Sequence, residues 1–297
     1  MLKTMKKIVV VTGGAGFIGS NLIRKLLSKT SYKILSVDDY SSGFKKNHIL
    51  NNRVKYIKGH TKNINKILEI YKKQINCIFH FGEFSRIHQS FYYSQKCFES
   101  NDLGTFNIIN FCKENKIRII YSATSAALGN MGNDSNLSPY AFTKSKNIDL
   151  LSNYKKWFNF KFDIIYFYNV YGSDQISIGD MATVIGIFEN QYLKKIPLTV
   201  VKPGTQKRKF THIDDTINAC MQVFKFRKYR QYSISYKKSY SILDIAKLFK
   251  CKIKFIQHRK GERYGSSVVK KIKGNKIVNL QAKKDIKDYI DSFINKK

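Results

Sequence analysis

Proline is scarce in this sequence, with three among 297 residues, and no segment is rich in both glycine and serine. Flexible linkers between separate domains usually have such a composition. Without one, the chain is expected to form closely packed lobes, with the chain crossing between them. The sequence also contains no internal repeat or low-complexity segment, and its length suffices for one large domain or two lobes.

Long apolar runs are missing as well. None reaches the roughly 20 residues that a membrane-spanning helix needs, and residues 1–7 lead into the first apolar run without a signal-peptide core. We therefore expect a cytoplasmic protein with no membrane partner.

Cysteines are few, and they form no Cys-x-x-Cys pair. A dispersed, odd-numbered set favours reduced thiols in the core over a disulfide framework or a zinc site. The six histidines form no ligand cluster along the sequence either, so no metal is expected. The cysteines are Cys77, Cys97, Cys112, Cys220 and Cys251.

Acidic residues number only 20 against 54 lysines and arginines, which gives a net charge of +34. Such a charge raises the hypothesis of nucleic-acid binding. The lysines, however, are spread from Lys3 to Lys297 singly and in pairs, without a basic arm. We therefore do not expect nucleic acid as a partner, and we expect the positive field to attract small anionic ligands.

A glycine-rich turn at residues 12–19 is the strongest local signal. It follows the apolar run of residues 8–11 and precedes a helical apolar pattern. Gly13, Gly16 and Gly19 are spaced to allow a tight turn, the approach of backbone to a pyrophosphate, and close packing of helix against strand. The helix N-terminus adds unpaired N–H groups for phosphates. The alternative is a glycine turn in an α/β protein that binds no nucleotide.

An acidic pair strengthens the nucleotide interpretation. The second apolar run, residues 34–37, ends at Asp38 and Asp39, about 20 positions after the turn. A carboxylate at this place accepts hydrogen bonds from the adenosine ribose and repels a 2′-phosphate. The sequence therefore favours NAD over NADP as the cofactor.

Alternating strand and helix patterns predict an α/β fold, with a Rossmann-like, doubly wound parallel sheet. Further strands are expected at residues 54–57, 77–82, 117–121, 198–201, 232–235 and 252–256, the fifth of these as the last strand of the main sheet. Helices are expected at residues 64–74, 96–115, 181–193, 214–226, 242–249 and 283–294, and another after Pro139. Because ligands bind at the carboxyl ends of parallel strands, one crevice should be lined by Gly13, Asp38, His60, Gly82 and Thr124.

The helix after Pro139 carries the expected chemistry. Tyr140 and Lys144 are four residues apart, so their side chains lie on one face of the helix. A phenol, with a pKa of about 10, is a poor base at neutral pH, but a nearby ammonium group favours the phenolate. Tyr140 is then a proton shuttle, and the Thr124 hydroxyl at the preceding strand end could donate to the same substrate oxygen.

Taken together, these motifs resemble the extended short-chain dehydrogenase/reductase superfamily. Within it, the chain is similar to the NAD-dependent nucleotide-sugar epimerases of the UDP-glucose 4-epimerase type, over nearly its whole length. The motifs that carry the resemblance are Thr12–Gly19, Val37–Gly43, Phe79–Gly82, Ser138–Lys144, Tyr168–Gly172, Gly204–Asp215 and Arg259–Glu262.

The resemblance implies a role for each matched residue. Tyr140 is the catalytic base, Lys144 binds the nicotinamide ribose, and Thr124 is the catalytic hydroxyl. The implied cofactor contacts are Gly13, Gly16, Phe17, Ile18, Gly19, Asp38, Asp39, His60, Phe81, Gly82, Asn101, Tyr140 and Lys144. The implied substrate contacts are Thr124, Asn169, Arg208 and Arg259, with the two arginines on the nucleotide diphosphate.

The resemblance also implies the domain organisation and partners. Residues 1–172 would form the NAD-binding domain, with the chain returning at about 210–236. Residues 173–297 would form mainly a smaller C-terminal α/β lobe for the substrate, a UDP-sugar or other nucleotide sugar. A homodimer would form through the helices at 96–115 and 140–157. The expected reaction is epimerisation of a UDP-hexose by transient oxidation at sugar C4.

The sequence departs from the family pattern at three places. His60 stands where relatives often have an aspartate, and Glu83 replaces the last alanine of the usual His-x-Ala-Ala motif. The connection from residue 129 to residue 140 is shorter than in typical epimerases. Glu83 is either a substrate contact or a tolerated replacement.

Other functions remain open. A dehydratase needs an acid and a base where this chain has Ser125 and Ala126, and the decarboxylase branch tends to carry a glutamate there. A keto-sugar reductase should prefer NADPH, which Asp38 opposes. A non-catalytic nucleotide- or nucleic-acid-binding protein, or an assembly partner, is the alternative of another class.

Overall fold

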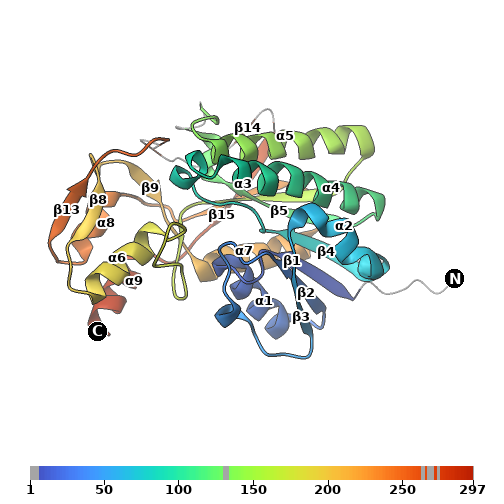
Figure 1. Ribbon diagram of the computed structural model, residues 1–297, viewed down its shortest axis with the longest axis horizontal. Helices are drawn as coiled ribbons and strands as arrows, with labels where there is room; N and C mark the ends of the chain where they lie inside the picture. Colours follow the sequence, from blue (N-terminus) through green and yellow to red (C-terminus); the bar gives the residue numbers. More distant parts are fainter. Residues whose placement is uncertain (1–6, 130–133, 262–264, 266–270, 273–274, 297) are drawn as a thin grey trace.

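A nine-stranded sheet forms the centre of the larger lobe (Figure 1). The structure, a computed structural model, describes residues 7–129, 134–261, 265, 271–272 and 275–296. In spatial order, the strands are β14 (Lys271–Ile272), β15 (Asn275–Gln281), β11 (Gln231–Ser235), β6 (Phe162–Phe167), β5 (Arg118–Thr124), β4 (Ile75–His80), β1 (Ile8–Thr12), β2 (Lys33–Asp38) and β3 (Val54–Lys58). All pair in parallel except β14 with β15. The strand order reverses between β1 and β4, the place where such sheets bind ligands.

Helices cover both faces of this sheet. Successive strand residues point to opposite faces, so Val9 and Val11 of β1 enter one core and Val10 the other. The first core lies against α1 (Phe17–Lys29) and α7 (Ile213–Phe226). The second lies against α2 (Ile64–Leu68), α4 (Gly104–Glu114) and α5 (Pro139–Phe158). Burial on both faces explains why the central strands read as continuous apolar runs.

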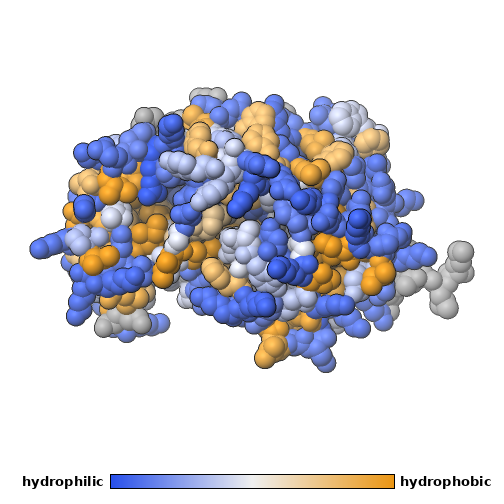
Figure 2. All heavy atoms as spheres, in the orientation of Figure 1, coloured by the Kyte–Doolittle hydropathy of each residue, from blue (hydrophilic) through white to orange (hydrophobic). Residues whose placement is uncertain are grey.

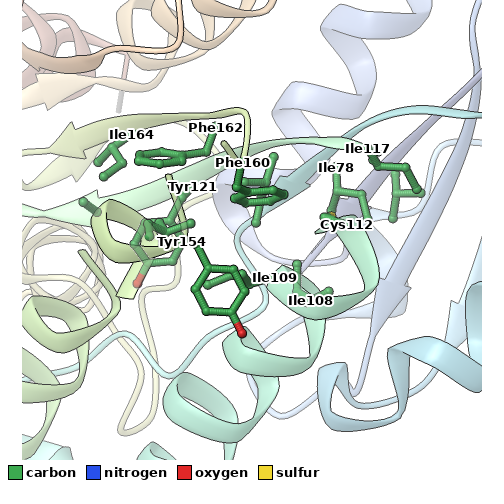
Figure 3. Close-up of a cluster of buried hydrophobic side chains, with 14 of the residues drawn as sticks. Ile78, Ile108, Ile109, Cys112, Ile117, Tyr121, Tyr154, Phe160, Phe162 and Ile164 are labelled. Atoms are coloured by element: carbon green, nitrogen blue, oxygen red, sulfur yellow. The ribbon is translucent and has the colours of Figure 1, made fainter. Parts of the chain in front are cut away.

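Figure 3 shows part of the second core, where strand side chains meet those of α4 and α5. Tyr121 of β5 is completely buried there, and Tyr154 of α5 keeps its ring in the core while its hydroxyl donates to Asn110 at 2.7 Å. The labelled side chains are Ile78, Ile108, Ile109, Cys112, Ile117, Tyr121, Tyr154, Phe160, Phe162 and Ile164.

The smaller lobe has a core of its own, on the left in Figure 1. It contains α6 (Val184–Leu193), α8 (Ile242–Leu248), α9 (Ile286–Asn295) and the parallel pair β8 (Leu198–Val201) and β13 (Ile253–Ile256). Two short pairs also occur, β7 (Val170–Tyr171) with β10 (Thr211–His212), and β9 (Lys207–Lys209) with β12 (Ser239–Ser241). As the sequence indicated, Ser241 caps α8, and Asp244 completes a reciprocal capping box.

The doubly wound α/β fold predicted from the sequence is confirmed. Two predictions about the sheet were incomplete. Strand β6 was missed, and β11 is not the last strand because β15 pairs with it from Gln231 to Ser235. Strand β15 begins 40 residues after the end of β11, so its pairing has no local sequence signal.

The helix predicted at 96–115 is interrupted. It consists of α3 (Ser94–Phe98), a π-helical turn (Glu99–Leu103) and α4. π-Helical turns often occur at functional sites. Here the turn contains Asn101, whose side chain is completely buried.

The face of the molecule drawn in Figure 2 is mostly polar. Figure 2 shows hydrophilic residues over most of the viewed face, with apolar residues in separate patches. Within the described residues, none of the helices has both the length and the apolar character needed to cross a bilayer.

Candidate active site

A cavity of about 590 Å³ lies at the carboxyl ends of the strands, between the large sheet and the smaller lobe. Residues that follow β1, β2, β4, β5 and β6 all contribute to its wall, as expected for a doubly wound sheet. The structure thus brings together fifteen residues that the sequence nominated: Gly13, Gly16, Phe17, Ile18, Gly19, Asp38, Asp39, Phe81, Gly82, Thr124, Tyr140, Lys144, Asn169, Arg208 and Arg259.

The glycine turn between β1 and α1 forms one wall of the cavity. Gly13 has a φ of +70°, and a Cβ there would lie 2.8 Å from the backbone nitrogen of Gly82. A Cβ on Gly19 would lie 2.1 Å from the carbonyl oxygen of Gly13. Both positions therefore require glycine. Because α1 begins at Phe17, its unpaired N–H groups and positive dipole end lie beside the cavity.

Asp38 is the last residue of β2, and its hydrogen bonds hold the glycine turn in place. Its carboxylate accepts the backbone N–H of Ala15 at 2.9 Å and that of Tyr40 at 2.8 Å. Burial raises the pKa of the Asp38 carboxyl, although these two donors oppose the effect. Each carboxylate oxygen keeps a further lone pair, so Asp38 can also accept a hydroxyl from the cavity side. A glycine cradle beside such a carboxylate fits a dinucleotide.

Two nominated cofactor residues do not line the cavity. His60 caps the following 3-10 turn by accepting the N–H of Lys62 at 3.0 Å, and its Nε2 lies 4.0 Å from Asp39. Asn101 is buried behind the wall, where its Oδ1 accepts the N–H of Phe84 at 2.7 Å and its Nδ2 donates to Thr143 at 3.0 Å. Asn101 therefore ties the segment after β4 to α5.

The first turn of α5 positions the Tyr140 and Lys144 pair. Ser138 caps the helix by accepting the N–H of Ala141 at 3.1 Å, and Pro139 occupies the first helical position. Tyr140 is only 7% exposed, and Lys144 is 3% exposed. Both lie in the cavity wall with Thr124, the last residue of β5.

Lys144 has a partner that the sequence did not predict. Its Nζ donates to the carbonyl oxygen of Ser122 at 2.6 Å and to the Glu83 carboxylate, with which it forms a buried ion pair. The same Nζ lies 4.7 Å from the centre of the Tyr121 ring. The sequence showed Glu83 as a departure from the family motif, but only the fold places it against Lys144.

A buried histidine connects this pair to the glycine turn. His80 bonds to the Thr12 hydroxyl at 2.8 Å and to the Thr105 hydroxyl at 2.9 Å, and Thr105 donates to Glu83 at 3.0 Å. Burial lowers the pKa of His80 to about 4, so the ring is neutral near pH 7. Thr12 also accepts the N–H of Gly82 at 3.0 Å, which fixes Gly82 against Gly13.

Arg86 is a second residue that sequence reasoning missed. It lies in the cavity wall after β4, and its Nε donates to the carbonyl oxygen of Met181 at 2.9 Å. Its Nη1 donates to the Ser85 carbonyl at 2.9 Å. Loss of hydration lowers the pKa of Arg86, and the nearby Tyr140 phenol opposes that effect. No carboxylate of a described residue forms an ion pair with Arg86.

Two further arginines line the cavity. Arg208 lies on β9 with 5% exposure and donates to the Lys207 carbonyl at 3.0 Å, and Arg259 also contributes to the wall. Asn169 follows β6 and also faces the cavity. The neighbouring Glu262 and residues 130–133 of the 129–140 connection, whose shortness the sequence singled out, lie outside the described residues.

In the described part of the chain, no group of three or more His, Cys, Asp or Glu side chains is arranged to hold a metal ion. Four cysteines are buried, as predicted, whereas Cys251 is partly exposed.

Comparison with known proteins places these features in a family. The model of the NAD dependent epimerase/dehydratase family matches residues 9–235. The chain is 26% identical to a putative UDP-glucose 4-epimerase of Methanocaldococcus jannaschii over 230 residues, which covers 74% of each protein. It is 27% identical to UDP-glucuronic acid decarboxylase 4 of Arabidopsis thaliana over 81% of this chain, and the match spans 56% of that longer relative.

A solved structure from a related enzyme also resembles this chain. A variant UDP-glucuronic acid 4-epimerase from Bacillus cereus, in complex with UDP-4-deoxy-4-fluoro-glucuronic acid and NAD, has a TM-score of 0.78 at 27% identity, covering 87% of this chain and 89% of that one. Because the family model matches most of its length, the chain belongs to the NAD-dependent epimerase/dehydratase family.

Proposed function

We propose that this protein is an NAD-dependent nucleotide-sugar epimerase that acts on a UDP-hexose at sugar C4. One observation carries the proposal: Tyr140, Lys144 and Thr124 line the same cavity as the glycine turn, Arg208 and Arg259. The relatives named above act on UDP-sugars, and the B. cereus structure contains NAD.

The chain's own residues account for the steps that this reaction needs. Tyr140, as phenolate, would remove the proton from the sugar C4 hydroxyl, and Thr124 would donate a hydrogen bond to the same oxygen. NAD, when bound, would supply reversible acceptance of the C4 hydride. The arginines would hold the diphosphate, which leaves the flat 4-keto sugar free to turn before reduction on its other face.

The strand end favours epimerisation over elimination. Thr124 is followed by Ser125 and Ala126, which form a 3-10 turn and are both buried. Neither side chain supplies the carboxylic acid and carboxylate that removal of water from the sugar would require. This supports an epimerase over a dehydratase.

A nucleotide sugar that carries a carboxylate is the second candidate substrate. Arg86 favours it, because a guanidinium that lines the cavity beside Tyr140 binds a carboxylate well. Relatives named for UDP-glucuronic acid agree with this choice. Such a substrate can be epimerised or decarboxylated after the same oxidation.

Proton NMR of the protein with NAD and a panel of UDP-sugars, UDP-glucuronic acid included, tests both proposals. We expect C4 epimers to interconvert without accumulation of NADH. A 4-keto-6-deoxy product would mean a dehydratase, and carbon dioxide release from UDP-glucuronic acid would mean a decarboxylase. No change in any sugar would contradict the enzymatic proposal.

Cofactor choice gives a separate prediction. Replacing Asp38 with Asn should weaken NAD binding by roughly tenfold, the value of one charge-assisted hydrogen bond. It should also reduce the ratio of the affinity for NAD to the affinity for NADP. Isothermal titration of both cofactors measures this. The matched variant Asp39→Asn removes the same charge from a more exposed carboxylate, which accepts bonds from Ser41. A larger effect at Asp39 would contradict the assignment of the ribose contact to Asp38.

We also propose the domain roles that the sequence indicated. Residues 1–172, with the return at about 210–236, would bind NAD, and residues 173–297 would mainly bind the sugar nucleotide, although β15 joins the large sheet. A cytoplasmic homodimer is part of this proposal. Phe98, Phe106 and Trp157, which are 39%, 42% and 62% exposed, support pairing through the helices at 96–115 and 140–157.

A further inference from the structure

Glu83 is a buried carboxylate in the cavity wall, with its side chain 1% exposed. Its Oε1 accepts the Tyr121 hydroxyl and the Thr105 hydroxyl, each at 3.0 Å, and the Asn147 amide at 3.3 Å. Its Oε2 accepts the Lys144 ammonium. Donors from β5, α4 and α5 thus converge on one carboxylate, which fixes its position and suits its ionised form.

This contact changes what Lys144 can do. An ammonium group has three N–H donors. Lys144 uses one on the Ser122 carbonyl and one on Glu83, which leaves one for a ligand in the cavity. The Glu83 charge also offsets the Lys144 charge at short range, so the pair presents little net charge to Tyr140.

We propose that Glu83 is a positioning residue that sets the ionisation of Tyr140 through Lys144. It fixes the ammonium beside the cavity and limits how strongly that ammonium favours the phenolate. The proposal rests on the proposed function for the role of Tyr140. It gives Glu83, which departs from the family motif, a specific role as the partner of Lys144.

The charged and titratable groups near Tyr140 define the expected direction. Lys144 lies one turn along the same helix, Glu83 and Arg86 of the segment after β4 line the same cavity, and Arg86 and Tyr121 of β5 interact electrostatically with Tyr140. Burial and the Glu83 carboxylate raise the pKa of Tyr121 well above its usual range, so this phenol stays protonated. Positive charges favour the ionised form of a phenol and a negative charge opposes it, so the charge of Glu83 should act against those of Lys144 and Arg86.

Three further titratable groups surround the ion pair of Glu83 and Lys144. Burial, with the Glu83 carboxylate opposing it, lowers the pKa of His80 to about 4, and burial raises that of Cys97 to about 11. Burial and the Glu83 carboxylate raise the pKa of Asp102 to about 6. Asp102 is therefore the group whose titration must be separated from that of the phenol.

The decisive variant is Glu83→Gln, which keeps the shape of the side chain and removes its charge. The acid limb of the pH–kcat profile should move to lower pH by about one unit, because the Lys144 charge is no longer offset. Glu83→Asp should restore most of the wild-type profile. Glu69→Gln breaks a surface ion pair with Lys72 and should leave the profile unchanged. An unshifted acid limb in a folded, active Glu83→Gln protein would overturn the proposal.

A second measurement does not depend on turnover. In protein labelled with ¹³C at the tyrosine Cζ atoms and saturated with NAD, the shift of each signal reports phenol ionisation, and the signal lost in Tyr140→Phe identifies Tyr140. Its titration midpoint should fall in Glu83→Gln and recover in Glu83→Asp, and Asp102 gives no signal. If no UDP-sugar turns over but this midpoint falls, the function proposal fails while the role of Glu83 stands. If a UDP-sugar turns over but the midpoint stays fixed, the proposed function stands and the proposed role of Glu83 fails.

Discussion

Replacing Tyr140 with phenylalanine should lower kcat for the interconversion of C4 epimers by roughly 10²–10⁴-fold, the usual contribution of a positioned acid–base group. The variant should fold and bind NAD as the wild type does. The Tyr140 ring packs with Cys97, Ala126 and Ala141, and phenylalanine keeps that packing. The hydroxyl makes no hydrogen bond to any described residue, so its loss leaves no buried group unpaired. Steady-state kinetics, cofactor titration and a melting curve measure these effects.

Tyr154→Phe is the matched control. Tyr154 lies on the same helix, and its hydroxyl donates to Asn110 at 2.7 Å, in the core rather than the cavity. Loss of that bond should cost about 1 kcal/mol of stability and leave kcat unchanged. Full activity in Tyr140→Phe would contradict the proposed mechanism, and equal losses in both variants would point to damage of α5 rather than of chemistry.

The predicted residues that the structure brings together in the cavity wall belong to local motifs. The glycine turn, Asp38, and the Tyr140 and Lys144 pair each occupy a few consecutive positions. Their geometry follows from helix and strand periods. The family and the doubly wound sheet inferred from these motifs are confirmed.

The parts that the sequence could not predict depend on distant partners. Glu83 lies 61 residues from Lys144, and Arg86 lies 95 residues from Met181. Neither separation has a periodic signature, and only the packed fold brings the side chains together. The same holds for the cavity walls: His60 and Asn101 were both predicted to contact the cofactor, but neither lines the cavity.

A buried ion pair outside the cavity links several elements of the larger lobe. Arg118 of β5 is 8% exposed, and Asp163 of β6 is completely buried. Arg118 Nε donates to Asp163 Oδ2 at 2.8 Å, and its Nη1 and Nη2 donate to the carbonyl oxygens of Phe224 and Val223 at 2.8 and 2.7 Å. Asp163 Oδ1 also accepts the N–H of Arg230 at 2.9 Å. The pair therefore joins two central strands to the last turn of α7 and to the entry of β11.

Replacing Arg118 with leucine should lower the free energy of unfolding by roughly 3–5 kcal/mol at pH 7, because the change leaves the Asp163 charge buried and unpaired. Urea unfolding measures the loss. Arg24→Leu is the control, since Arg24 is exposed and, among the described residues, donates to Asn21 alone, and its effect should stay within about 0.5 kcal/mol. Neither arginine lines the cavity, so the KM of Arg118→Leu should be normal at temperatures where it is folded.

The pH dependence of the stability loss in Arg118→Leu distinguishes two causes: an unpaired buried charge on Asp163 and the lost packing of the arginine side chain. Burial raises the pKa of the Asp163 carboxyl even with Arg118 beside it, and removal of the guanidinium should raise that pKa further. An acid whose pKa is higher in the folded state than in the unfolded state costs stability as pH rises through that interval. The loss in Arg118→Leu should therefore shrink as the pH falls through the raised pKa of Asp163, where this carboxyl takes up a proton. The double variant Arg118→Leu with Asp163→Leu should be more stable than Arg118→Leu alone. A loss that is independent of pH and additive in the double variant would show that the packing of the arginine side chain, and not its charge, joins these strands.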